Sequence, residues 1–146
     1  MIIKDLMTAD ALPALTAQMQ FAARRQPLIA HNIANISTPD FRPVDVKPQQ
    51  FQEALSEAVD RRRERFGGVR GELEIRESRE LRVDSRGRLD LRPTASGDNV
   101  LFHDRNDRDV ERLLQAQTEN LAAFRLASQL FRSRMDLLNT AITERV

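Results

Sequence analysis

Residues 12–36 decide the fold, and they read LPALTAQMQFAARRQPLIAHNIANI. Apolar side chains recur along this stretch at alternating steps of three and four residues, interrupted once by the polar Gln26. Such spacing is the a/d pattern of a heptad repeat and predicts a helix with one apolar stripe. The residues predicted to contact a partner helix through it are Leu12, Leu15, Met19, Ala22, Ile29, Ile33 and Ile36.

The last part of the chain follows the same spacing, with polar steps at Gln117 and Ser128. Both stripes are narrow, which is typical of a contact line for one or two partner helices rather than of the wider apolar face in a globular core. The residues predicted to contact a partner from this second helix are Val110, Leu114, Leu121, Phe124, Phe131, Met135, Leu138 and Ile142.

Capping residues and prolines predict where the first helix begins and ends. Thr8 or Asp10 is expected to cap its first turn, in which Pro13 is tolerated. Pro39 disfavours helical geometry in the residue before it, so the helix should end within residues 35–37.

Pro27 lies inside the first stripe and removes one helical hydrogen bond. We expect a kink over residues 23–26, or else two shorter helices that share one stripe, and the unbroken phase of the stripe favours the kink. The last helix should be capped by Asp104 or Asp107 and should continue to Thr143. Its length would be roughly 50 Å.

The middle of the chain has a different pattern. Three prolines predict extended backbone over residues 38–48, and residues 49–66 predict a short helix that Gly67 and Gly68 end. The side chains expected on one side of this helix are Phe51, Leu55, Val59 and Phe66.

From Gly71 to Arg92 the apolar period changes to two, which indicates strands. The turn at residues 84–87 predicts a small hairpin, and residues 93–99 are expected to form a loop. The predicted fold is therefore mainly α: long terminal helices form an antiparallel, coiled-coil-like pair around an irregular middle with a small β-hairpin. The expected segments are residues 1–37, 38–97 and 98–146.

Composition and motifs argue against an enzyme. The chain has no Cys and a net charge of +1, and its two histidines, His31 and His103, have no partners at metal-ligand spacing. Asp104, Asp107 and Asp109 are interpreted as helix-capping and first-turn charges rather than as metal ligands. We expect no catalytic residue, cofactor or metal. We also expect no signal peptide and no membrane insertion, because no long apolar run is present.

The run Arg61-Arg62-Arg63-Glu64-Arg65 is the strongest candidate for contact with nucleic acid. Acidic neighbours offset its charge, and no aromatic residues interleave with it for base stacking. A solvated helix face or an ion-pair surface between subunits is the favoured interpretation.

The segment His31-Asn-Ile-Ala-Asn-Ile-Ser-Thr-Pro-Asp-Phe-Arg42 resembles the N-terminal signature of the flagellar axial proteins, the family of rod, hook and filament-junction subunits. Asp40 stands where that signature usually has Gly, at a position expected to need a positive φ, which Asp tolerates. Phe41 replaces the usual Tyr. The residues that match or stand within the signature are Asn32, Ile33, Ala34, Asn35, Thr38, Pro39, Asp40, Phe41 and Arg42.

Within that family the chain is most similar to a proximal rod subunit. The features are its short length, Arg24-Arg25-Gln26 before the signature, Val44-Asp45-Val46 after it, and the ending Leu137-Leu-Asn-Thr-Ala-Ile142. The resemblance implies a structural subunit of the flagellar basal body that is exported without a cleaved signal. Its implied partners are other rod and basal-body proteins, ring or adaptor proteins, further copies of itself, and the export apparatus. Another rod subunit, a cytoplasmic helical adaptor or chaperone, and a nucleic-acid-binding protein remain as alternatives.

Overall fold

A computed structural model describes residues 9–68, 70–95 and 110–143. Within these residues the chain forms three helices: α2 (Leu12–Ala34), α3 (Pro48–Phe66) and α4 (Val110–Thr143). The same residues form two antiparallel pairs of strands, β1 (Val44–Asp45) with β4 (Thr94–Ala95) and β2 (Leu81–Val83) with β3 (Leu89–Leu91). The prediction of a mainly helical chain with long terminal helices and a small antiparallel hairpin in the middle is confirmed.

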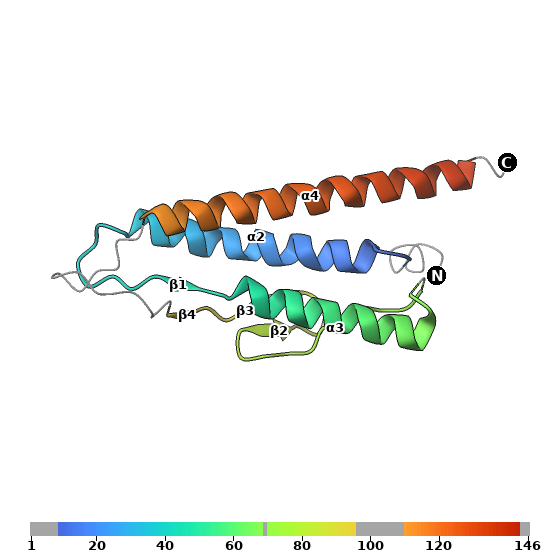
Figure 1. Ribbon diagram of the computed structural model, residues 1–146, viewed down its shortest axis with the longest axis horizontal. Helices are drawn as coiled ribbons and strands as arrows, with labels where there is room; N and C mark the ends of the chain where they lie inside the picture. Colours follow the sequence, from blue (N-terminus) through green and yellow to red (C-terminus); the bar gives the residue numbers. More distant parts are fainter. Residues whose placement is uncertain (1–8, 69, 96–109, 144–146) are drawn as a thin grey trace.

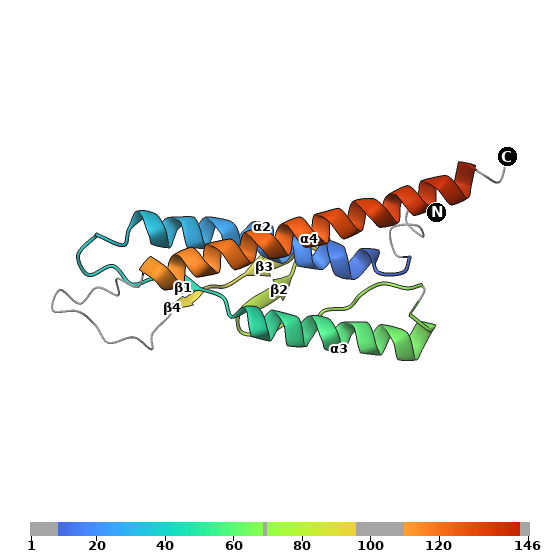
Figure 2. The ribbon, with the colours of Figure 1, turned by 45° about the horizontal axis from the view of Figure 1, so that its top comes forward.

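Helices α2 and α4 pack against each other in opposite directions. Asn120 of α4 contacts Ala22, Ser128 contacts Met19, and Arg134 pairs with Asp10, so residue numbers rise along one helix as they fall along the other. Figure 1 shows α2 between α4 on one side and the strands with α3 on the other. In both ribbon views α4 continues past the beginning of α2 (Figures 1 and 2).

The start of α2 differs from the prediction. Its N-cap is Ala11, which makes no side-chain capping hydrogen bond, whereas Pro13 lies in the first turn as expected. Asp10 precedes the cap and has a left-handed backbone conformation, with φ 49°. Its carboxylate forms an ion pair with Arg134 instead of capping the helix. The capping role of Asp10 is therefore wrong, and Thr8 lies outside the described residues.

Helix α2 runs through Pro27 as one helix of 23 residues, so the alternative of two separate helices is not observed. The helix ends at Ala34 with Asn35 as its C-cap, one residue before the predicted range of 35–37. Helix α4 ends at Thr143, as predicted, and its 34 residues span about 50 Å. Its expected caps, Asp104 and Asp107, lie outside the described residues.

A second buried face of α2 carries most of the core. Ala17 and Phe21 pack with Val46, Phe51 of α3 and the hairpin residues Leu81 and Leu89. The rings of Phe21 and Phe51 stack with centroids 4.1 Å apart and an interplanar angle of 6°. The expectation that α2 has only one narrow contact line is therefore wrong, because this helix is covered on two sides.

Helix α3 has the predicted extent, and three of the four predicted side chains lie on its covered side: Phe51 is buried, and Leu55 and Val59 are half-buried. Ala58 and Arg62 are also buried there, whereas Phe66 is 54% exposed. The predicted face included Phe66 because only apolar residues were counted, and it missed Arg62. Gly67 ends the helix in the left-handed conformation with φ 68°, as expected of a C-terminal glycine.

The hairpin forms as predicted, with Leu81 opposite Leu91 and Val83 opposite Leu89. Its two strands contribute Leu81 and Leu89 to the core that α2 and α3 complete. One strand was not predicted: Thr94 and Ala95, expected in a loop, pair with Asp45 and Val44. The expected loop is thus wrong for these two residues, and residues 96–99 lie outside the described chain.

The hairpin turn contains a carboxylate whose pKa is perturbed. The backbone N–H of Arg88, and then its guanidinium group, donate hydrogen bonds to Asp84 and lower the pKa of that carboxyl below its usual 3.8. Because the pKa is lower in the folded chain than in the unfolded chain, the carboxylate stabilises the turn above pH 3.8. This contribution is lost as the pH falls through the folded value.

We expect a carbon-detected NMR titration of Asp84 to show a midpoint below 3.8. The substitution Arg88→Gln removes the guanidinium group, one of three donors to this carboxylate, and should raise that midpoint part of the way to 3.8. Arg86→Gln is the matched control, because residue 86 bonds this carboxylate only through its backbone N–H. A midpoint that Arg88→Gln leaves unchanged would contradict this assignment.

Candidate functional site

The segment that carries the resemblance joins the end of α2 to β1, and Asn32 fastens its two ends together. The side-chain amide of Asn32 donates to the carbonyl of Val44 at 2.8 Å, and its side-chain oxygen accepts from the N–H of Val44 at 3.1 Å. Asn32 is 1% exposed. The side chain thus takes the place of a neighbouring strand and holds the returning chain against α2.

Asn35 closes the end of α2. Its backbone N–H and its side-chain amide both donate to the carbonyl of His31, at 3.1 and 2.9 Å. The N–H of Thr38 then donates to the carbonyl of Asn35 at 2.9 Å, which turns the chain. Asp40 follows with φ 57°, so the expected positive φ at this position is confirmed. The Phe41 ring contacts the His31 ring edge-on at 5.6 Å.

The other residues of the segment lie around this reversal. Ile33 is half-buried, whereas Ala34, Pro39 and Arg42 are exposed. The structure therefore places the side chains of the segment in two groups: one fixes the chain reversal, and the other faces outward.

Two stretches that flank the segment meet through an ion pair. Arg25, which is 6% exposed, donates from Nε to one carboxylate oxygen of Asp45 at 2.9 Å and from a terminal nitrogen to the other oxygen. Asp45 also accepts from the N–H of Val46. A buried, two-point arginine contact fixes both distance and orientation. The middle of α2 is therefore tied to β1.

Sequence reasoning missed Glu80, a carboxylate that is 5% exposed. It accepts from the backbone N–H of Lys47 at 2.8 Å and from the hydroxyl of Thr94 at 2.9 Å. Lys47 is the N-cap of α3, so Glu80 supplies the acceptor that no residue of the helix itself provides. No local spacing predicts this contact, because its partners lie 33 and 14 residues away along the chain.

The arginine run of α3 is engaged within the chain. Arg62 is 6% exposed and donates to the carbonyls of Asp10, Arg70 and Gly71. The three other arginines pair with carboxylates at 3.2–3.7 Å; these contacts are Arg61 with Glu57, Arg63 with Asp60 and Arg65 with Glu74. The interpretation as a basic surface for nucleic acid is weakened, because Arg62 is a buried structural residue.

The contact between α2 and α4 contains a buried polar group. Asn120, which is 4% exposed, donates to the carbonyl of Ala22 and to the side-chain oxygen of Gln26, both at 2.9 Å. Gln26 was the polar interruption in the first stripe, and its partner lies in the second helix. A single buried amide in a helix pair favours one alignment of the two helices, because any shift leaves it without partners.

The side of α4 that faces α2 is not the predicted stripe over the first half of the helix. The buried positions are Asn120 and Ala127, and half-buried residues continue the same side. Those half-buried residues are Leu113, Ala116, Gln117, Ala123, Ser128, Phe131, Met135 and Leu138. Three alanines on this side, Ala116, Ala123 and Ala127, could have indicated from the sequence which side faces α2, because small side chains let two helices approach closely.

Large apolar side chains of α4 remain exposed. Val110, Leu114, Leu121, Phe124 and Ile142, all from the predicted stripe, are 38–53% exposed, and Leu126, Leu130 and Leu137 are 47–59% exposed. Surface apolar residues are common singly, but a row of them along one helix marks a contact surface. Helix α4 therefore has apolar surface that α2 does not cover.

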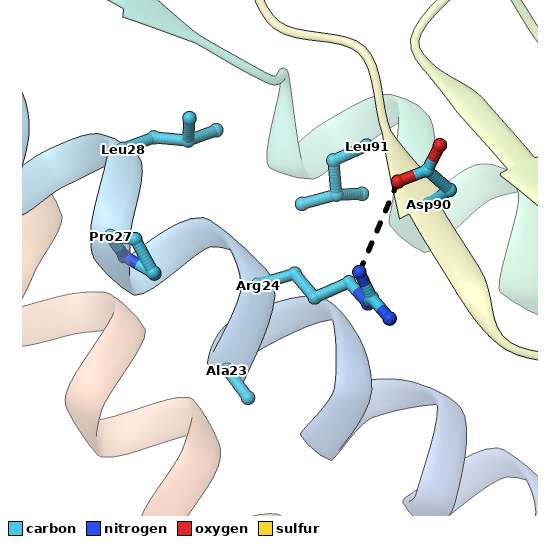
Figure 3. A pocket seen from close by; sticks show the side chains of 6 residues that line it. All are labelled: Ala23, Arg24, Pro27, Leu28, Asp90 and Leu91. Carbon is cyan, nitrogen blue, oxygen red and sulfur yellow. Dashed lines mark ion pairs between the residues drawn. The ribbon is translucent and has the colours of Figure 1, made fainter.

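A shallow hollow lies between α2 and β3, and Figure 3 shows the six residues around it. Arg24 and Asp90 face each other at 3.9 Å, and Pro27 and Leu28 line the hollow from α2. Arg24 and Asp90 are both largely exposed. The hollow has no buried polar group among its lining residues, so it offers little chemistry for holding a ligand.

Among the described residues, no three His, Cys, Asp or Glu side chains are grouped as metal ligands would be. His31 is exposed, with Asn35 and Phe41 as neighbours. His103, Asp104, Asp107 and Asp109 lie outside the described residues. None of the helices in the described part of the chain combines the length and the apolar character needed to cross a membrane.

Searches with this sequence found no matching protein-family model and no matching curated protein.

Proposed function

We propose that this chain is a structural subunit of the rod of the bacterial flagellum, of the kind represented by the proximal rod protein FlgB. The single observation that supports assembly most directly is the apolar surface of α4. One helix covers one side of it, whereas large side chains on its other sides are exposed. A subunit surrounded by neighbours in a polymer has this distribution of apolar residues.

The signature segment supports the same proposal. Asn32 and Asn35 are the two asparagines that the flagellar axial signature shares, and in this chain each holds part of one tight reversal. Arg25 and Asp45, which stand in the two flanking stretches of the resemblance, are joined by a buried ion pair. These contacts give the signature residues a physical role: they set the direction in which the chain leaves α2.

In this proposal the subunit passes unfolded through the flagellar type III export channel and then joins other rod and basal-body proteins, at the ring or adaptor that the rod stands on. The exposed residues of the terminal helices hold the subunits together in a shaft that transmits torque. The related rod protein FlgC is the alternative within the family. Its closing helix typically carries an Ala-x-Arg-x-Tyr pattern, and this chain contains no Tyr.

Immunogold labelling of isolated flagellar bases tests the proposal. We expect an antibody against the chain to label the base of the rod, and cells that lack the chain to assemble no rod beyond it. A chain found only in the soluble fraction, in cells with complete flagella, would contradict the proposal and favour a cytoplasmic helical adaptor. Binding to DNA that weakens steeply with salt would favour a nucleic-acid-binding protein instead.

Deleting residues 1–36 is expected to abolish incorporation into the rod, because the deletion removes α2 with Asn32 and Asn35. Incorporation is measured by the amount of chain in purified basal bodies. Ser85→Ala, at the exposed hairpin turn, is the control and should leave that amount unchanged. A deleted chain that still incorporates would show that the first helix does not hold the subunit in place.

A further inference from the structure

The β2–β3 hairpin and the loop before it carry a group of arginines whose side chains have no partner. Residues 76–92 contain six arginines and four acidic residues. Five of the arginines are exposed, and their guanidinium groups make no ion pair or hydrogen bond within the part of the chain that the structure describes. These five, which we call the hairpin arginines, are Arg76, Arg79, Arg82, Arg86 and Arg92.

The four acidic residues of the same stretch are engaged elsewhere. Glu77 and Asp84 accept backbone N–H groups of the hairpin, and Asp84 also takes the Arg88 guanidinium group. Glu80 is buried and accepts from outside the hairpin, and the nearest basic partner of Asp90 is in α2, at 3.9 Å. None of these carboxylates pairs with the guanidinium group of a hairpin arginine, so the five groups stay available to carboxylates of another molecule.

The arginine run of α3 differs in this respect. Three of its members pair with carboxylates of the same chain, and Arg62 is buried. Consecutive positions along the sequence therefore do not identify the arginines that are available for binding, whereas the contacts do. In the middle of this chain the available positive charge lies on the hairpin.

The pairing of the two strands places two of the hairpin arginines side by side. Leu81 faces the core, and because side chains alternate along a strand, Arg82 lies on the opposite face of the hairpin. Arg82 stands opposite Asp90. The N–H of Arg92 donates to the carbonyl of Glu80 at 2.8 Å, which continues the pairing one step past β3. Arg92 is therefore a diagonal neighbour of Arg82, at a distance of about 7–8 Å.

We propose that the hairpin arginines form a docking surface for an extended acidic segment of another protein, with Glu or Asp at every second position. In extended chain, side chains on one side recur about every 6.6 Å, close to the diagonal distance between Arg82 and Arg92. A guanidinium group can hold a carboxylate through two parallel hydrogen bonds. A single exposed ion pair contributes little, so binding requires several to form together. This inference goes beyond the proposed function and does not depend on it.

A peptide fits this surface better than a nucleic acid or a membrane does. Residues 76–92 contain no aromatic side chain on which bases could stack. Asp84 and Asp90 lie among the arginines and would repel a phosphate backbone, which is charged at every nucleotide, whereas a peptide can have neutral residues at these places. The leucines and the valine of the hairpin belong to the core or pack against it, so they are not available to enter a lipid surface.

The acidic segment is expected to lie across the hairpin rather than to add a strand at its edge. In β2 the N–H groups of Leu81 and Val83 already donate to side chains of the preceding loop. In β3 the N–H of Leu89 donates to the side chain of Gln20 in α2. These edge donors are therefore taken, and the side chains of the arginines supply the contacts.

Fluorescence anisotropy with the full chain tests this surface. The probe is a fluorescein-labelled peptide of about ten residues in which Glu and Ser alternate. We expect saturable binding at an ionic strength of about 0.02 M, and severalfold weaker binding at about 0.3 M, because exposed ion pairs are screened by salt. The same peptide with Gln in place of Glu should not bind.

Two double substitutions locate the binding surface. Arg82→Gln with Arg92→Gln should weaken binding of the Glu-Ser peptide about tenfold. Both side chains are exposed and unpaired, so circular dichroism should show this variant folded. The matched control, Arg125→Gln with Arg132→Gln, removes the same charge from exposed positions of α4, which lies on the other side of α2 from the hairpin (Figure 1). It should change the affinity by less than about twofold.

Four outcomes would overturn the proposal: no binding by the unaltered chain, equal weakening by the two double substitutions, equal binding of the Gln peptide, or tighter binding of another anionic probe. The other probes are a thymidylate of about ten nucleotides and vesicles of phosphatidylserine with phosphatidylcholine. Tighter binding of either would assign the surface to nucleic acid or to a membrane. These results are independent of immunogold labelling, so the docking surface and the rod assignment can each fail alone.

Discussion

Replacing Phe51 by Ala is expected to lower the free energy of unfolding by about 3–5 kcal/mol. Phe51 is 0% exposed and stacks on Phe21, and it belongs to a core that also includes Val46, which follows β1, and residues of both strands of the hairpin. Because several separate parts of the chain form this core, the cavity left by the substitution cannot close by the movement of one of them. Single domains have total stabilities of about 5–15 kcal/mol, so this loss is a large part of the whole.

Urea denaturation followed by circular dichroism measures the effect. Phe66→Ala is the matched control, because Phe66 is the same residue type on the same helix but is 54% exposed. Its cost should stay below about 1 kcal/mol. Equal losses from the two substitutions would mean that the Phe21–Phe51 stack is not the centre of the core.

The second large effect is expected from Asn32→Asp. The substitution keeps the shape of the side chain but replaces the amide that donates to the carbonyl of Val44 with an oxygen that repels it. It also introduces an acidic group at a position that is 1% exposed. We expect a loss of about 2–4 kcal/mol at neutral pH, from the missing hydrogen bond and the burial of charge.

Thermal denaturation at pH 7 and at pH 4 checks the second prediction. The loss should be smaller at pH 4, because a protonated carboxyl is neutral and again has a hydrogen to donate to Val44. Asn139→Asp, on the exposed side of α4, is the control and should change stability by less than about 0.5 kcal/mol. A loss that does not depend on pH would contradict the argument from the Asn32–Val44 contact.

Local rules predicted a large part of this fold from the sequence. The extent of α3, the C-terminal ends of α2 and α4, the positive φ of Asp40 and the hairpin around residues 84–87 each depend on residues within a few positions of one another. Proline geometry, the tolerance of Gly and Asp for a left-handed conformation, and a change of apolar period from about 3.6 to 2 are enough for these features.

The missed features involve partners that are far apart along the chain. The pairing of Thr94 with Asp45, and the contacts of Glu80 with Lys47 and Thr94, span 14 to 49 residues. The second buried face of α2 was missed because two of its members, Arg25 and Asn32, are polar. A search for apolar periodicity passes over a buried arginine or asparagine, whose burial depends on partners that only the folded chain supplies.

The position of the signature segment in the fold was predicted from the sequence, but the hydrogen bonds that its residues make were not. Its position after a helix and before an extended strand followed from Pro39 and from the end of the stripe. That Asn32 would bond both backbone groups of Val44 did not follow, because the twelve-residue separation has no fixed geometry in a loop. The resemblance therefore located the residues, and the hydrogen bonds explain what these residues do within the chain.

Helix α4 is expected to be less stable against local opening than the rest of the described chain. The principal apolar core is made by α2, α3, the hairpin and Val46, and α4 contributes no side chain to it among the described residues. Its main neighbour is α2. Free energies of local opening follow the apolar contacts that each element makes. Helix α4 is therefore expected to open at a lower free energy than α2, α3 and the hairpin.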